Sequence, residues 1–308
     1  MKTKIVYFGT PQFAANVLEY LAQQNVPIVG IVTQPDRPKG RSNALEPSPV
    51  KKIAGQCFPN VPILQPEKAS QEEFLQQLQS LNADLYVVVA YGQILTQKLL
   101  SIPPKGCINV HASLLPKYRG AAPMQRCLMA GERVTGICIQ KMVRQLDAGD
   151  VIATAKMEIP QNMNLGELET SLCNISKTVL LQVIREFEDK IPDAIAQDHS
   201  LATYASKIDP AEGEIHWDEP AEKIHHLIRA FSPKPGAWIW LEPQVKKMKI
   251  LRSELIPDQQ GKAGTVLSKD GIVACGQGSI RILEVQPEGK KCMHWEDWYR
   301  GTKNLLSF

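Results

Sequence analysis

The first half of the chain alternates short apolar runs with segments of helical periodicity. Pro11, a residue suited to the first turn of a helix, precedes a stretch with apolar residues on one helical face: Phe13, Val17, Leu18 and Leu21. Alternation of strand and helix is typical of a mostly parallel sheet covered by helices. The pattern therefore predicts an α/β domain, with strands at residues 5–8, 28–32, 85–90 and 107–110.

Two later apolar runs, at 137–142 and 151–159, predict further strands, and an antiparallel extension of the sheet is one candidate arrangement for them. A long helix then begins at Asn164, with Glu167 three residues later as a capping box requires. Its apolar positions recur at helical spacing: Leu168, Leu172, Ile175, Val179, Val183 and Phe187. We expect this helix to close a first domain over residues 1–189.

Residues 190–206 lose this periodicity and are predicted to be a linker. Beyond it, one helical stretch near 221–231 precedes five short β-like runs, at 238–241, 247–251, 265–267, 272–275 and 280–285. Short strands joined by glycine-containing turns predict a small β-barrel over residues 207–308, and an oligonucleotide/oligosaccharide-binding (OB) barrel is one candidate.

Composition is that of an ordinary globular protein, with 308 residues, 44% of them hydrophobic and 22% charged. No apolar run reaches the roughly 18 to 20 residues of a membrane span, and the apolar run near the start is too short for a signal peptide. The seven cysteines are scattered without a CxxC pair, which argues against a disulfide framework and a thiolate zinc site. We expect a soluble, cytoplasmic protein.

Net charge is only +3, but its distribution is uneven. From Arg229 to the end, thirteen Lys and Arg residues stand against eight Asp and Glu, a local excess of +5. Such an excess weakly favours an anionic partner, although an ordinary solvated surface explains it equally well.

One segment, residues 106–120, carries the candidate chemistry. Asn109 and His111 are two residues apart at the end of an apolar run, so in a strand they point to one side. Ligands bind at the carboxyl ends of strands in open α/β sheets, and Asp147, between two predicted strands, could return a carboxylate there. From the residues alone, the three form either a structural cluster or a catalytic site. Neither a GxGxxG nor a GxxxxGK[ST] motif is present, which argues against dinucleotide and P-loop sites.

The pattern Asn109-x-His111-x-Ser113-Leu114-Leu115-Pro116-x-x-Arg119-Gly120, followed by Asp147-x-Gly149, resembles the 10-formyltetrahydrofolate-dependent formyltransferases. This resemblance implies a Rossmann-like formyltransferase domain, 10-formyltetrahydrofolate as co-substrate and no metal. It also implies that the catalytic residues are Asn109, His111 and Asp147, and that the folate-contacting residues are Ser113, Leu114, Leu115 and Pro116. An X–Pro bond allows a cis peptide at small cost, so Leu115–Pro116 is a candidate.

A second resemblance concerns the formyl acceptor. Residues 33–41 and 47–51 resemble the insertion that one branch of this family uses to reach the acceptor end of methionyl initiator tRNA. The motif Phe8-Gly9-Thr10-Pro11-x-Phe13 and the appended C-terminal domain also match that branch. They imply tRNA contacts from Arg41 and Lys39, and a role in translation initiation. The chain departs from the branch at Ser42-Asn43-Ala44, where lysines are common.

Two alternatives stay open at this stage. One is a formyltransferase for a nucleotide-linked amino sugar, which shares the motif around His111, and the other is a catalytically silent RNA-binding protein. We expect no membrane association and no obligate protein partner. Trp238, Trp240, Trp295 and Trp298 are available to stack on bases, but Trp238 and Trp240 are expected to serve the barrel core and are not assigned as contacts.

Overall fold

A computed structural model describes residues 2–39, 44–241, 246–256 and 258–301. The chain divides into two compact units. The first comprises residues 1–120, 136–157 and 170–204, and the second comprises residues 121–135, 158–169 and 205–308.

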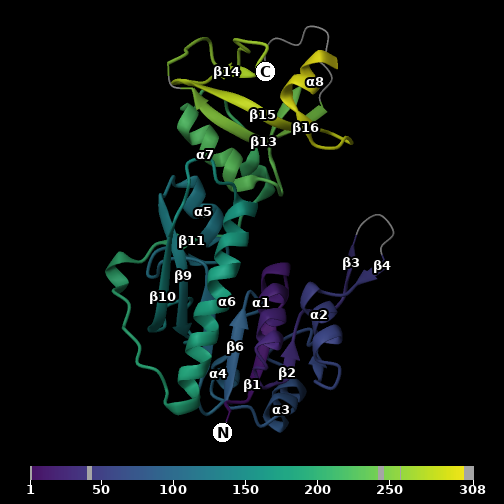
Figure 1. The fold of residues 1–308 in the computed structure, drawn as a ribbon, viewed down its shortest axis with the longest axis vertical. Helices are drawn as coiled ribbons and strands as arrows, with labels where there is room; N and C mark the ends of the chain where they lie inside the picture. Colours follow the sequence, from purple (N-terminus) through teal and green to yellow (C-terminus); the bar gives the residue numbers. More distant parts are fainter. Residues whose placement is uncertain (1, 40–43, 242–245, 257, 302–308) are drawn as a thin grey trace. The chain divides into compact units, whose positions relative to one another are not determined.

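A seven-stranded sheet organises the first unit, and the apolar runs predict all of its strands except β5 (Figure 1). Strands β5, β2, β1, β6 and β7 are parallel to one another, whereas β9 is antiparallel to β7. The prediction of a mostly parallel α/β sheet is therefore confirmed. In sheet order, the strands are β10 (Val151–Glu158), β9 (Val134–Lys141), β7 (Cys107–His111), β6 (Leu85–Val89), β1 (Ile5–Gly9), β2 (Ile28–Val32) and β5 (Ile63–Leu64).

Helices bury both faces of this sheet. On β1, Tyr7 donates a hydrogen bond to the Ala14 carbonyl of helix α1 (Gln12–Gln23), while Val6 and Phe8 pack on the opposite side with Phe74 of α3 (Glu72–Ser80). Every residue of β1 and β6 is buried, as expected of strands covered on both faces. The remaining helices of this part of the chain are α2 (Pro49–Cys57), α4 (Gln97–Leu100) and α6 (Leu165–Asp189).

The predicted start of the long helix is confirmed by reciprocal hydrogen bonds. The Asn164 side chain accepts from the Glu167 backbone N–H at 3.0 Å, and the Glu167 carboxylate accepts from the Asn164 N–H at 2.9 Å. This capping box satisfies two N–H groups that have no partner inside the helix. Helix α6 then presents a continuous apolar face, with Leu168, Leu172 and Phe187 fully buried.

The second unit contains helix α7 (Ala221–Phe231) and a five-stranded sheet of order β12-β13-β15-β14, with β16 paired to β15. Its strands are β12 (Ala237–Leu241), β13 (Lys246–Ile256), β14 (Ile272–Ala274), β15 (Ser279–Pro287) and β16 (Met293–His294). The predicted run at 265–267 makes only an isolated bridge, between Val266 and Val273. Strand β16 and helix α8 (Trp295–Gly301) were not predicted, and closure into an OB barrel stays a prediction.

The tryptophans of this unit occupy both buried and exposed positions. Trp295 and Trp298, for which the sequence predicts no position, are buried, whereas Trp238 and Trp240 were predicted to lie in the core. The prediction is wrong for Trp240, whose side chain is 42% exposed. Strand alternation explains the difference, because the core face of β12 is already filled by Ala237, Ile239 and Leu241.

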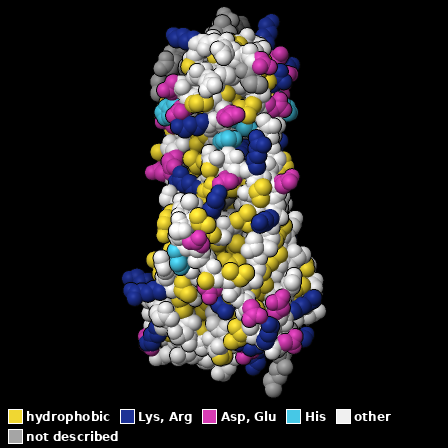
Figure 2. Space-filling model, turned by 90° about the vertical axis from the view of Figure 1, so that its left-hand side faces the viewer, with side chains coloured by type: hydrophobic (Ala, Val, Ile, Leu, Met, Phe, Trp, Pro, Cys, Tyr) yellow, Lys and Arg dark blue, Asp and Glu magenta, His cyan; other side chains and the backbone are white. Residues whose placement is uncertain are grey.

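Short elements complete the described chain: β3 (Arg37–Lys39), β4 (Ala44–Glu46), β8 (Arg119–Gly120), α5 (Pro123–Met129), β11 (Tyr204–Ala205) and two 3-10 turns, η1 (His199–Leu201) and η2 (Pro210–Gly213). Within the described residues, no helix is both long and apolar enough to cross a membrane. On the face that Figure 2 shows, basic and acidic side chains are interspersed, in keeping with the small net charge.

Candidate active site

Strand β7 carries Asn109 and His111 at its carboxyl end, where the parallel part of the sheet meets antiparallel β9. In register, Asn109 pairs with Gln140 and His111 with Cys138 of β9. His111 is only 5% exposed, whereas Asn109 is half-buried. No hydrogen-bond partner of the Asn109 side chain occurs among the described residues. The strand therefore presents a free amide beside a fixed imidazole.

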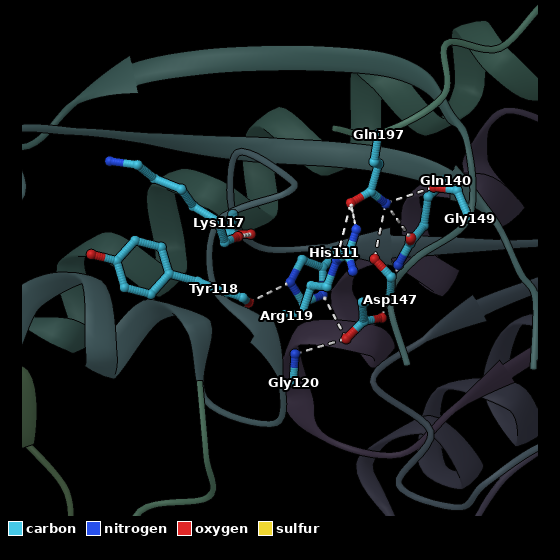
Figure 3. A network of polar contacts seen from close by, with 10 residues as sticks. His111, Lys117, Tyr118, Arg119, Gly120, Gln140, Asp147, Gly149 and Gln197 are labelled. Atoms are coloured by element: carbon cyan, nitrogen blue, oxygen red, sulfur yellow. Dashed lines mark hydrogen bonds and ion pairs between the residues drawn. The ribbon is translucent and has the colours of Figure 1, made fainter. Parts of the chain in front are cut away.

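Both nitrogens of the His111 ring face a polar partner (Figure 3). The Nε2 atom lies 2.9 Å from the Tyr118 carbonyl oxygen. Because a carbonyl can only accept, Nε2 carries a proton, and in the neutral ring the lone pair is on Nδ1. Nδ1 lies 3.7 Å from Oδ2 of Asp147, which is close enough for charge stabilisation but long for a hydrogen bond.

The Asp147 carboxylate is fixed by two donors from different segments. Oδ2 accepts from the Gly120 backbone N–H and Oδ1 from the Gln140 side-chain amide, both at 2.8 Å. Asp147 adopts a φ of 45°, a left-handed conformation that non-glycine residues seldom take. This backbone geometry turns the carboxylate towards His111, as Figure 3 shows.

The glycine of the Asp147-x-Gly149 pattern has a steric role. A Cβ atom at Gly149 would lie 1.7 Å from the Lys141 carbonyl oxygen, well inside van der Waals contact. Only glycine therefore allows the loop after β9 to pass this close to the strand. The close passage brings Asp147 back over the end of the sheet.

Two buried residues hold this arrangement together: Arg119 of the motif and Gln197, which the sequence did not identify. Gln197 donates to the carbonyl oxygens of Asp147 and Gly149, at 2.9 and 2.6 Å, and its own oxygen accepts two hydrogen bonds from the Arg119 guanidinium. Arg119 is 1% exposed and also contacts Nδ1 of His199 at 2.9 Å.

Gln197 and His199 lie in the segment predicted to be a linker. No local pattern marks them, because their contacts reach back 50 to 80 residues along the chain. The sequence offered one signal for these partners, which is Arg119 of the motif, since a guanidinium that becomes buried needs hydrogen-bond acceptors.

The segment Ser113–Pro116 forms a tight turn after β7. The fully buried Ser113 hydroxyl donates to the Lys117 carbonyl at 2.6 Å, so this side chain braces the turn. The Leu115–Pro116 peptide is cis, the isomer that the sequence suggested as a candidate. Leu114, Leu115 and Pro116 are half-buried and keep part of their apolar surface accessible.

The 33–51 insertion is anchored at its base. Thr33 and Ser48 share a buried hydrogen bond of 2.7 Å, and Lys51 forms an ion pair with Asp36 at 2.7 Å. Hydrogen bonds from Lys51 and Gln65 hold the pKa of Asp36 below its ordinary value. Lys39 ends strand β3, a short hairpin strand that was not predicted, and Arg41 lies outside the described residues.

Comparison with family models finds two matches along the chain. Residues 1–184 match the model described as formyl transferase, and residues 207–303 match that of the formyl transferase C-terminal domain. Within the described part of the chain, no group of three or more His, Cys, Asp or Glu side chains could hold a metal ion.

Curated relatives resemble the chain over its full length. A methionyl-tRNA formyltransferase of Protochlamydia amoebophila is 46% identical over 313 residues, which is 100% of this chain and 98% of the relative. A methionyl-tRNA formyltransferase of Symbiobacterium thermophilum is 42% identical and covers 97% of this chain and 92% of its own length.

Solved structures share the fold at much lower identity. WlaRD, a sugar 3N-formyl transferase crystallised with dTDP and 5-N-formyl-THF, is 17% identical with a TM-score of 0.69, covering 94% of this chain and all of its own. HypX from Aquifex aeolicus in complex with tetrahydrofolic acid is 12% identical with a TM-score of 0.67, covering 97% of this chain and 47% of its own.

Proposed function

The chain belongs to the formyl transferase family, and from this premise we propose that it transfers the formyl group of 10-formyltetrahydrofolate to the α-amino group of methionyl initiator tRNA. The observation that carries the proposal is the grouping of a free amide, an imidazole and a carboxylate at the end of β7. Full-length relatives named methionyl-tRNA formyltransferase, at 40 to 46% identity, favour tRNA over an amino sugar as acceptor.

Formyl transfer from a folate nitrogen to a primary amine develops negative charge on the formyl oxygen. Asn109 is suited to stabilise this charge, since no other described residue engages its amide N–H₂ group. A preorganised donor at such a position typically contributes about 3 to 4 kcal/mol of barrier reduction. Asn109 therefore takes the role of oxyanion donor.

His111 takes the role of proton shuttle. The attacking amine must lose a proton and the departing folate nitrogen must gain one. With Nε2 engaged by the Tyr118 carbonyl, Nδ1 is the atom that accepts and returns this proton. The fixed ring keeps the Nδ1 lone pair in one direction, so that no ring reorientation is needed between the two transfers.

Asp147 takes the role of electrostatic partner. Its carboxylate, 3.7 Å from Nδ1, stabilises the imidazolium that forms when His111 holds the proton. The two hydrogen bonds from Gly120 and Gln140 hold the carboxylate in place beside the ring.

For the folate, we propose a surface along Ser113, Leu114, Leu115 and Pro116. The half-buried Leu114, Leu115 and Pro116 offer apolar contact for a heteroaromatic ring, and the turn's backbone offers polar groups. Ser113 acts indirectly, since its hydroxyl is committed to the Lys117 carbonyl. Bound there, the co-substrate supplies the formyl carbon to the end of β7.

For the tRNA, we propose phosphate contacts from Lys39 and Arg41, on an insertion whose base is held by the Thr33–Ser48 and Asp36–Lys51 contacts. We place the reaction in the cytoplasm, where translation begins, with no metal, membrane or obligate protein partner required. The catalytic domain is proposed to span residues 1–189, followed by a linker to 206 and a tRNA-binding OB-like domain.

The test is a transfer assay with 10-formyltetrahydrofolate and three acceptors offered separately: methionyl initiator tRNA, methionyl elongator tRNA and an amino sugar nucleotide. We expect formylation of the initiator tRNA alone. Transfer to the sugar instead would support the amino sugar alternative, and binding of tRNA without any transfer would support the silent RNA-binding alternative.

A further inference from the structure

Two tryptophans stand on the outer face of the second unit's sheet. On β12, Ala237, Ile239 and Leu241 point into the core, while Trp238 is half-buried and Trp240 is 42% exposed. The opposing strand β13 alternates in the same way, with Met248 and Ile250 buried. An exposed tryptophan is not needed to complete this core.

Lysines face the two rings across the strands. Trp238 pairs with Lys249 and Trp240 with Lys247, so all four side chains project from one face. The Lys247 Nζ lies 3.7 Å from the centre of the Trp238 ring and 4.8 Å from that of Trp240. The two rings are themselves in contact, with centres 5.5 Å apart.

Further basic residues surround this face. Lys246 is exposed at the start of β13. Strand β15 ends beside β13, because its last residue, Pro287, pairs with Met248. Lys290 and Lys291 follow, both exposed, in the turn before β16. Acidic residues also adjoin this face: the Glu288 carboxylate accepts a weak hydrogen bond from the Lys247 backbone N–H at 3.4 Å, and Glu214 forms a backbone bridge with Trp238. Among the described residues named here, the lysines outnumber these carboxylates.

We propose that this face, defined by Trp238, Trp240, Lys247 and Lys249, binds an unpaired nucleotide of the tRNA substrate. An accessible indole stacks on any base, and ammonium groups beside it neutralise the flanking phosphates. Neither property alone would select RNA, but an aromatic ring set among lysines matches the alternation of base and phosphate along a single strand. The proposal rests on the proposed function, since it names where part of that tRNA binds.

Geometry assigns different roles to the two rings. Their planes are inclined by 80°, so they cannot form one flat platform. Trp240, the more exposed ring, is the stacking surface. Trp238 supports it and is itself held by a 3.4 Å contact from its Nε1 to the Pro210 carbonyl. Lys247, now over both rings, is in position to move to a phosphate when the base arrives.

The test uses the full chain and methionyl initiator tRNA as the probe. In Trp240→Leu the side chain stays apolar but can no longer stack, and in Trp240→Phe stacking is kept. We expect Trp240→Leu to raise KM for the tRNA by about fivefold or more, with kcat and KM for the folate unchanged, and Trp240→Phe to stay within about twofold of the parent. Leu267→Ala, which truncates another exposed apolar residue of the same unit at 37% exposure, is the matched control.

A binding measurement keeps this inference separate from the proposed function. Uncharged initiator tRNA should quench tryptophan emission of the parent chain, and the quenching should fall in Trp240→Phe, which keeps the stack but lacks the indole. The inference would be overturned if Trp240→Leu kept the parent KM for the tRNA and Trp240→Phe kept the parent quenching. Formylation by the parent chain would be unaffected by that result. A parent chain that formylates no tRNA would instead contradict the proposed function.

Discussion

Polar side chains are fixed by hydrogen bonds around His111, but they stay accessible on the outer face of β12 and β13. Around His111, the Asp147 carboxylate receives two hydrogen bonds at 2.8 Å and lies beside the almost fully buried imidazole. On the sheet of the second unit, the Lys247 ammonium rests on aromatic rings, and its neighbour Lys246 is exposed. The first site fixes its imidazole and its carboxylate by internal hydrogen bonds, and the other keeps charges available for a partner.

This difference follows from the two tasks. Stabilising a transition state requires donors whose positions are fixed before the reaction, because reorganisation would cost part of the gain. Binding a large polyanion requires several exposed cations, each contributing a small and salt-dependent share. We therefore expect substitutions near His111 to lower kcat, and substitutions on basic surfaces to raise KM for the tRNA.

The sharpest test of the contrast is at the end of β7. Asn109→Ala and His111→Ala should each lower kcat by about a hundredfold or more, since one removes the oxyanion donor and the other the proton shuttle. Steady-state formylation of methionyl initiator tRNA measures this, and KM for the tRNA should change far less. Asn60→Ala, at an exposed position, is the matched control. Near-parental turnover in either variant, with normal folding, would refute the role given to that residue.

A second test asks whether the site around His111 depends on the buried amide of Gln197. In Gln197→Leu, the Asp147 and Gly149 carbonyls lose a donor and the buried Arg119 guanidinium loses an acceptor. Each unsatisfied buried group costs about 1 to 3 kcal/mol. We expect a clear loss in urea-unfolding stability and a decrease in kcat of about tenfold.

The matched variant is Gln197→Glu, which keeps an acceptor for Arg119 but removes the donor to the two carbonyls. A smaller loss of stability than in the leucine variant, with a similar loss of kcat, would separate the two functions of this side chain. Equal kcat in the parent and both variants would show that the carbonyl contacts do not position Asp147.

Sequence reasoning succeeded where local patterns decide the structure. The buried strands β1, β2, β6 and β7 are continuous apolar runs, and the start of α6 carries its capping box in adjacent residues. It missed β5, β3 and β16, which are two or three residues long and are defined by pairing with partners elsewhere. Too few residues lie in these strands to show an alternation.

The candidate active site was predictable only where its residues lie close together in the sequence. The strand spacing places Asn109 and His111 together, but the return of Asp147 depends on Gly149 and on Gln197, whose contacts cross 50 residues. The position of Trp240 shows the same limit, because a strand with five residues of similar apolarity does not reveal which face is covered. Long-range packing, rather than local propensity, determines these features.

A third test addresses the insertion, where effects should be smaller. Arg41→Ala should weaken tRNA binding several-fold and flatten the dependence of log Kd on log salt by about 0.7 to 0.9, the share of one phosphate contact. Binding titrations at four salt concentrations measure the slope. Lys262→Ala, which removes an exposed cation of the second unit, serves as control and should leave the slope unchanged. An unchanged slope in Arg41→Ala would argue against a phosphate contact there.

The smallest expected effect concerns pH and the second unit. Burial, reinforced by the nearby Arg229 and His225, lowers the pKa of His226 from 6.5 to about 4. The ring packs on Gly131, where a Cβ atom would lie 2.4 Å from its Cε1. Between pH 6.5 and 4, the unfolded chain therefore binds a proton at this residue that the folded chain excludes. Stability is complete above pH 6.5 and is lost as the pH falls towards 4.

The measurement compares urea midpoints of the parent chain and His226→Gln at pH 7 and pH 5. Because glutamine does not titrate, the variant should lose less stability on acidification, by about 1 kcal/mol once the partial exposure of the ring is allowed for. His216→Gln, at an exposed position, should behave like the parent. If His226→Gln and the parent lost equal stability, the ring would be protonated without cost in the folded state, and the buried cation Arg229 beside it would not be disfavouring its charge.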